Sequence, residues 1–243
     1  SSAITGDFIF WSAPVELFDV AGITSPNAAQ AFIYDVSAIN TDGTAGDFIF
    51  ASGVMLDAKG YSVQVPNEFV PSGFTASFEG KAANGQITID AFKSPSANEP
   101  AEELRHWNLI GNPYPSAINV EEFLTENTAL EGNVRFWSNG NTGNTALAGA
   151  FYTGVAYTYG DQYVTYNRTG STPDMFGGNI ASGQGFFVQV DESAGPTSSV
   201  AFNNTMRFDA AEIAYDNSQF IETNQSSSVA SNPNNQLVWL SLV

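Results

Sequence analysis

The sequence predicts an all-β protein made of two related β-sandwich-like halves, with one short helix in the second half. Short apolar runs rich in Phe, Ile, Val and Tyr alternate with turn residues, a pattern typical of sandwiches and barrels. Residues 60–65, GYSVQV, return as residues 185–190, GFFVQV. A similar strand-like block follows each copy, at 75–79 and at 199–203. These echoes predict an internal duplication of one β-rich unit.

The first half is expected to cover residues 1–98. Its predicted strands lie at 6–12, 30–37, 46–56, 61–65, 74–80 and 85–92. Asn84 and Gly85 lie between the last two strands. An Asn-Gly pair between alternating runs is a strong hairpin signal, because both residues tolerate positive φ. We therefore expect strands 74–80 and 85–92 to pair with each other.

The boundary between the halves is predicted within residues 93–104, which contain two prolines and no apolar periodicity. The second half, 99–243, adds Tyr-rich and Gly/Asn-rich insertions to the repeated unit. Its predicted strands lie at 106–110, 133–138, 155–159, 162–167, 185–191, 198–203, 205–209 and 236–243.

The helix is predicted over 120–127 in the second half. Asn119 is a suitable N-cap, and Glu121 and Glu122 in the first turn favour the positive end of the helix dipole. Phe123 and Leu124 are expected to face the core.

The charge balance excludes several classes of partner. The formal net charge is −18, from 25 acidic and 7 basic residues, so the surface should repel polyanions. Nucleic acid and anionic lipid are therefore not expected as partners. No apolar run approaches the roughly 20 residues that cross a bilayer, so no membrane insertion is expected.

The composition is typical of secreted or surface proteins, because only 13% of residues are charged while Ser, Thr, Asn and Gly are abundant. Residues 1–6 have neither the basic nor the apolar region of a signal peptide. We expect that a signal has been removed or that the chain is a fragment of a larger protein.

Catalytic groups are sparse. The chain has no cysteine and one histidine, His106, which any Ser-His-Asp arrangement would have to use. A structural or hydrogen-bonded surface histidine is the simpler interpretation. Motifs for a nucleophile elbow, a zinc protease or a phosphate loop are absent. No catalytic residue and no enzyme activity are predicted.

A calcium site is the one cofactor hypothesis. Residues 40–47, NTDGTAGD, place short oxygen-bearing side chains around two glycines, as a hard cation needs from a tight loop. The candidate ligands are Asn40, Asp42 and Asp47. An ordinary turn between two strands is the alternative.

Tyrosines in the insertion of the second half suggest a ligand-binding platform. Tyr157, Tyr159 and Tyr163 could present flat rings to the apolar faces of sugars while their hydroxyls stay hydrated. Residues 151, 155, 157 and 159 share one strand parity, so burial in the core is the alternative for part of this set.

Three ordered blocks carry a family resemblance. They are residues 107–118, WNLIGNPYPSAI, residues 182–188, SGQGFFV, and residues 202–207, FNNTMR. The chain resembles, over nearly its whole length, the region that precedes the sorting domain in large surface proteins exported by type IX secretion in Bacteroidota. Residues 6–15, GDFIFWSAPV, look like the block that starts the same region.

The resemblance implies a secreted protein, extracellular or attached to the cell surface, and supplies no catalytic residues. The blocks themselves indicate architecture: Tyr114 can anchor the chain by packing its ring, and Gly185 permits close backbone approach. We therefore expect a non-catalytic β-sandwich module that acts in adhesion or extracellular interaction. Its partner would be a surface protein or an extracellular polysaccharide. The alternatives are a carbohydrate-binding module and a polysaccharide-degrading enzyme.

Overall fold

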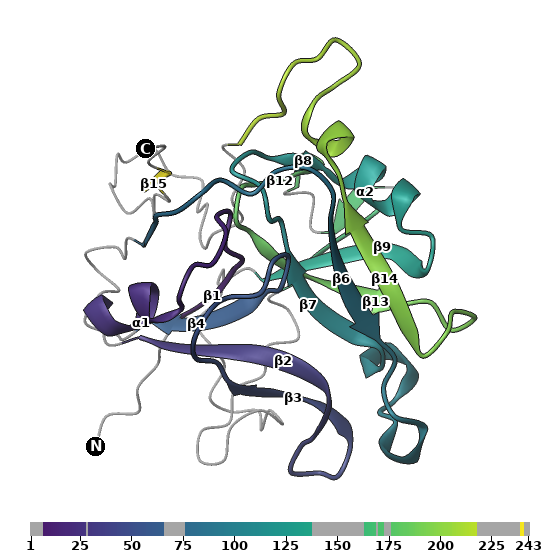
Figure 1. Cartoon of the computed structure of the whole chain (residues 1–243). Coiled ribbons are helices and arrows are strands. Elements are labelled where there is room, and N and C mark those ends of the chain that lie inside the picture. Colours follow the sequence, from purple (N-terminus) through teal and green to yellow (C-terminus); the bar gives the residue numbers. More distant parts are fainter. Residues whose placement is uncertain are drawn as a thin grey trace, which may run out of the picture.

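The computed structural model describes residues 7–27, 29–65, 76–137, 163–168, 170–172, 176–217 and 239–240. The predicted all-β class is confirmed: strands form several sheets, and the described residues contain two short α-helices (Figure 1). The first sheet has the order β1 (Asp7–Trp11), β4 (Tyr61–Val65), β2 (Gln30–Ile39) and β3 (Ala45–Phe50), and every neighbouring pair is antiparallel.

The second sheet has five antiparallel strands. Their order is β11 (Gly170–Thr172), β10 (Tyr163–Asn167), β9 (Leu130–Trp137), β13 (Gly185–Val190) and β7 (Trp107–Gly111). In Figure 1 this sheet lies to the right of and above the first one.

The two sheets share one strand order. In each, the first strand of the half lies beside the strand that carries the echo, which lies beside the strand that follows the helix. The helices are α1 (Ala21–Asn27), before β2, and α2 (Val120–Glu126), before β9. This order is compatible with the internal duplication, which itself stays a prediction.

Each echo begins at a glycine that lies against the first strand of the other half. A Cβ built on Gly60 would be 2.6 Å from the carbonyl oxygen of Ile110, in β7. A Cβ built on Gly185 would be 2.9 Å from the carbonyl carbon of Phe10, in β1. Backbone hydrogen bonds join the two halves next to both glycines, from Gly60 N to Leu109 O and from Ser12 N to Gly183 O. A side chain at either glycine would push the halves apart.

The remaining strands form two-stranded sheets. β6 (Ile87–Phe92) pairs in antiparallel fashion with β14 (Thr197–Phe202), and β8 (Ile118–Asn119) with β12 (Asn179–Ile180). β5 (Ser77–Phe78) pairs in parallel with β15 (Trp239–Leu240). Three 3-10 helices, η2 (Ser96–Asn98), η3 (Glu102–Leu104) and η4 (Asn204–Arg207), complete the described elements.

The predicted hairpin between 74–80 and 85–92 is wrong. Gly85 does take a positive φ of 83°, but β6 uses all six of its residues to pair with β14. The turn before β6 is held from elsewhere, since Ala83 N donates to Pro14 O. Long-range pairing therefore overrides the local turn signal. It also crosses the predicted boundary after residue 98, and the division into two domains there stays a prediction.

The predicted helix is confirmed as α2. Asn119 Oδ1 accepts hydrogen bonds from Glu121 N at 2.9 Å and Glu122 N at 3.1 Å, and Phe123 and Leu124 are buried. The sequence did not predict α1, AGITSPN, whose glycine, proline and β-branched residues disfavour a helix. At its start, Asp19 Oδ1 accepts from Ala21 N at 2.8 Å and so satisfies one amide of the first turn.

An aromatic cluster fills the space between the two sheets. The ring of Phe187 lies 5.6 Å from that of Phe10 and 5.2 Å from that of Tyr34, both edge to face. Two further apolar clusters are present: one around Ile23 and Phe78 lies within the first half, and the other, around Phe123, also takes in Ala58 and Ala91 of the first half. Edge-to-face rings add specific contacts to the burial of the sheet faces.

The motif residues serve the scaffold. Tyr114 is fully buried, which confirms its predicted anchoring role, and its hydroxyl donates to Gly85 O at 2.6 Å. The side-chain amide of Asn112 donates to three carbonyl oxygens, those of Ser116, Ile180 and Ala181. These contacts fix the chain where it leaves β7.

Candidate functional site

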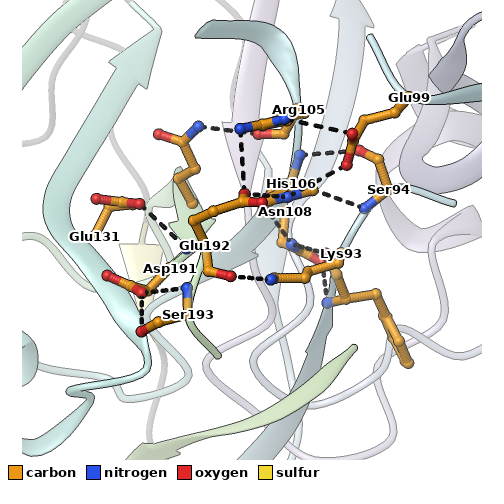
Figure 2. Close-up of polar contacts among 12 residues, drawn as sticks. Lys93, Ser94, Glu99, Arg105, His106, Asn108, Glu131, Asp191, Glu192 and Ser193 are labelled. Carbon is orange, nitrogen blue, oxygen red and sulfur yellow. Dashed lines mark hydrogen bonds and ion pairs between the residues drawn. The ribbon is translucent and has the colours of Figure 1, made fainter. Parts of the chain in front are cut away.

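The single histidine lies in a polar network that joins residues distant in sequence (Figure 2). His106 directly precedes β7 and is only 3% exposed. Its φ of 65° is in the left-handed region, which a non-glycine residue occupies at a cost of about 1–2 kcal/mol. The hydrogen bonds around it offset that strain.

Ser94 holds the histidine from both sides. The amide of Ser94 donates to His106 Nδ1 at 3.0 Å, and the amide of His106 donates to Ser94 Oγ at 2.9 Å. Because a backbone N–H can only donate, Nδ1 is the unprotonated nitrogen. The proton of the neutral ring therefore sits on Nε2.

The Glu192 carboxylate accepts a hydrogen bond from His106 Nε2–H. Its Oε2 lies 2.9 Å from His106 Nε2 and 3.4 Å from Arg105 Nη2 (Figure 2). Lys93 Nζ donates to the backbone oxygen of Glu192. The hydrogen bond from His106, helped by the positive charges of Arg105 and Lys93, lowers the pKa of the Glu192 carboxyl.

Glu99 and Asn108 close the network. Glu99 Oε2 lies 3.3 Å from Arg105 Nη1, and its other oxygen is 3.6 Å from His106 Nε2. Asn108 pairs with the backbone of Phe92 in both directions at 2.9 Å. The network thus fastens the 93–106 connection to β7 and to the loop between β13 and β14.

This arrangement cannot carry out triad chemistry. A catalytic histidine needs a free ring nitrogen to take a proton from a hydroxyl. In this structure Nδ1 accepts an amide N–H, Nε2 faces a carboxylate, and the Ser94 hydroxyl accepts from a backbone N–H. The geometry agrees with the interpretation of His106 as a structural residue.

The candidate calcium ligands are only partly brought together. Asn40 and Asp42 lie in the turn between β2 and β3, where Asn40 Oδ1 accepts from Asp42 N at 3.0 Å. Asp42 Oδ1 accepts from the hydroxyl and the amide of Thr44, and these bonds lower the pKa of its carboxyl. Asp47 lies on β3, and its Oδ1 accepts from Phe48 N at 2.7 Å.

These bonds show an ordinary Asx-type turn that supports itself. In the described part of the chain, no group of three or more His, Asp or Glu side chains could hold a metal ion. Calcium binding at Asn40, Asp42 and Asp47 stays a hypothesis.

One of the three candidate tyrosines lies in the described residues. Tyr163, on β10, is half-buried and packs edge to face on Trp137, with the ring centroids 5.2 Å apart. It thereby joins the aromatic cluster between the sheets. Tyr157 and Tyr159 lie outside the described residues, so the sugar-platform hypothesis stays a prediction.

A comparison with protein-family models matches residues 1–243 to the family described as "Domain of unknown function (DUF8693)". The chain belongs to the DUF8693 family. A search of curated proteins and a search of solved structures each found no match. Among the described residues of this DUF8693 domain, no helix is long and apolar enough to span a bilayer.

An exposed apolar surface of the DUF8693 domain was not foreseen from the sequence. We define the apolar patch as Leu17, Val54 and Leu56, which are 81%, 48% and 64% exposed. Met55 N donates to Phe18 O at 2.7 Å, and Asp19 pairs with Val54, so the two segments run side by side. No pattern in the sequence signals this patch, because Val54 and Leu56 lie at the end of the predicted strand 46–56 and Leu17 lies in no predicted element.

Proposed function

We propose that the chain is a non-catalytic β-sandwich module of a secreted, cell-surface bacterial protein, and that it acts in adhesion or extracellular interaction. The apolar patch is the observation that carries this proposal. Exposed apolar side chains that gather at one place mark interaction surfaces more often than isolated ones do. Covering a leucine fully stabilises a complex by about 1.5–3 kcal/mol relative to leaving it exposed.

Leu17 adds backbone strain to this exposure. Its φ is 56°, which costs a non-glycine residue about 1–2 kcal/mol, and little of its side chain is buried in return. Glycine would adopt the same backbone without strain. The free-energy cost of holding a large apolar side chain in solvent on a strained backbone is offset when a partner covers that side chain.

The patch is held rigidly, which favours recognition. Val20 N donates to Gly53 O at 2.9 Å, and Met55 N bonds Phe18 O, so hydrogen bonds fasten both segments. A surface that is already ordered loses little conformational entropy when it binds. The family resemblance and the secretory composition support an extracellular setting for this contact.

The polar network around His106 supports a non-catalytic role for the chain. His106, Glu192 and Asn108 are engaged with groups of the chain itself, as the geometry above describes. They join distant segments and contribute to the stability of the fold.

Adhesion under flow tests the proposal. Beads coated with the full chain should be retained on octyl-coated glass more than on hydroxyl-coated glass. Leu17→Gly should reduce that retention at least several-fold while leaving the melting temperature equal or higher, because it removes the strain. Loss of adhesion without loss of stability separates recognition from folding.

Leu104→Ser is the matched control, since Leu104 is 59% exposed but lies in η3, outside the patch. Its retention should equal that of the unaltered chain. Equal retention on both glasses, or equal loss in Leu17→Gly and Leu104→Ser, would contradict the proposal.

A further inference from the structure

The turn at Asn84 and Gly85 combines exposure with open space. The Asn84 side chain is exposed, and Gly85 adopts a φ of 83°. A Cβ built on Gly85 would have no atom within 4 Å, so the surroundings of its Cα are unobstructed. A small ring formed between the Asn84 side chain and the Gly85 backbone would meet no steric barrier on that side.

Such a ring is the intermediate of asparagine deamidation. The Gly85 nitrogen gives its proton to water and forms a bond to Asn84 Cγ, while the Cγ–Nδ2 bond breaks and Nδ2 leaves as ammonia. Water then opens the cyclic imide at either carbonyl, which yields aspartate or isoaspartate. The two reacting groups belong to adjacent residues, so the step is intramolecular and favoured by proximity.

Two hydrogen bonds in the structure oppose this reaction. Arg207 Nη1 donates to Asn84 Oδ1 at 2.9 Å, which prevents the side-chain amide from rotating over the backbone. Gly85 N donates to Asn204 Oδ1 at 3.3 Å, which holds the proton that must leave. We call the contacts from Arg207 and Asn204 the clamp. Both must open before the nitrogen can attack.

The clamp is anchored in the second half of the chain. Arg207 Nε donates to Ser116 Oγ at 2.7 Å, and the guanidinium lies 5.0 Å from the centre of the Tyr114 ring. Tyr114 itself donates from its hydroxyl to Gly85 O at 2.6 Å. The clamp therefore joins the turn before β6 to the segment that follows β7.

We propose that Asn84 is a deamidation site of the folded chain and that the clamp sets its rate. Isoaspartate inserts one extra carbon into the main chain between residues 84 and 85. That insertion displaces Gly85 O from Tyr114 and removes the Asn84 amide from Arg207. The reaction would thus slowly and irreversibly break this contact between the two halves.

Ageing of the full chain in mildly alkaline buffer tests the proposal. Peptide mapping by mass spectrometry resolves the site, and isoaspartyl methyltransferase labels the isoaspartate product. The unaltered chain should convert slowly at Asn84, and Asn84→Gln should show no conversion there. Arg207→Gln should convert about tenfold faster or more, the effect expected when one charge-assisted hydrogen bond is lost.

Asn204→Ala should also accelerate conversion, and it tests the clamp through the Gly85 amide if Arg207→Gln disturbs folding. Arg168→Gln is the control for charge, because Arg168 is exposed and, within the described residues, its Nη2 donates to Thr125 Oγ1 at 3.5 Å, away from the clamp. It should leave the rate unchanged. Melting temperatures, measured in parallel, identify any variant whose rate reflects unfolding.

Two results would overturn the proposal. Absence of conversion at Asn84 in both the unaltered chain and Arg207→Gln would show that the turn cannot form the imide. Slower conversion in a folded Arg207→Gln would show that the guanidinium promotes the attack by polarising the Asn84 carbonyl, the opposite of a clamp.

Discussion

Gly185→Ala tests whether close contact between the halves explains the glycine that begins the second echo. A Cβ there would lie 2.9 Å from both the carbonyl carbon and the Cβ of Phe10, and 3.1 Å from its carbonyl oxygen. Carbon atoms pack at about 3.5–4.0 Å, so β1 and β13 would have to separate by about half an ångström or more. The obstructing atoms include backbone, which cannot rotate away as a long side chain can.

The expected cost follows from two opposing terms. Overpacking of this kind destabilises by about 1–3 kcal/mol, and replacing glycine by alanine within a strand returns about 0.5–1 kcal/mol. The net loss therefore lies between about 0 and 2.5 kcal/mol, with a central value of roughly 1 kcal/mol. For a chain of this length, each kcal/mol lowers the melting temperature by about 2–4 °C.

Urea unfolding followed by tryptophan fluorescence measures the loss as a lower midpoint with an unchanged slope. Gly60→Ala should behave in the same way, because its Cβ would lie 2.6 Å from Ile110 O. Gly195→Ala is the control, since the nearest atom to its Cβ is Thr197 O at 3.6 Å, an ordinary contact. If Gly185→Ala unfolds at the same urea concentration as Gly195→Ala, the close-contact explanation is refuted.

Three further predictions concern the cap, the carboxylate network and the turn. Asn119→Ala should cost about 1 kcal/mol, read as a lower urea midpoint, because two amides at the start of α2 lose their acceptor. The Glu192 carboxyl has a lowered pKa in the folded chain, so its stabilisation is present above the unfolded pKa of about 4.3 and is lost as pH falls through the folded value. Urea midpoints measured against pH should show this acid loss, and Glu192→Gln should reduce it; equal slopes in both chains would contradict the network. The calcium hypothesis predicts a melting temperature that rises with added Ca²⁺ and falls with chelator, and an Asp42→Ala variant that no longer responds.

Local features of the fold could be predicted from the sequence. The capped helix α2 depends on Asn119 and on residues within one turn of it, so spacing alone identifies it. The echoed strands β4 and β13 were also predicted, because their apolar residues recur in a short window. Where local propensity and tertiary packing agree, sequence patterns suffice.

Long-range pairing explains what the sequence could not predict. Asn84 and Gly85 carry a strong hairpin signal, yet β6 pairs with β14, more than 100 residues further along. No local pattern reports such a partner. The helix α1 forms despite a glycine and a proline, because burial of Ile23 and of the side chains around it outweighs weak propensity.

The His106 network was missed for a related reason. Ser94 is 12 residues away from His106 and Glu192 is 86 residues away, so only the folded topology brings them together. The sequence supports a hydrogen-bonded histidine as the simpler interpretation, but it cannot name the partners.

The distribution of polar contacts limits where recognition can occur. Several charged or titratable side chains form hydrogen bonds or ion pairs that hold the fold together. They include His106, Arg105 and Arg207. A group held in this way cannot contact a partner without weakening the fold. Exposed apolar side chains such as Leu17 do not join distant segments in this way, so their replacement can change binding while the fold persists. Sequence patterns assign apolar residues to the core, and for this reason the surface best suited to interaction is the part that the sequence predicts least well.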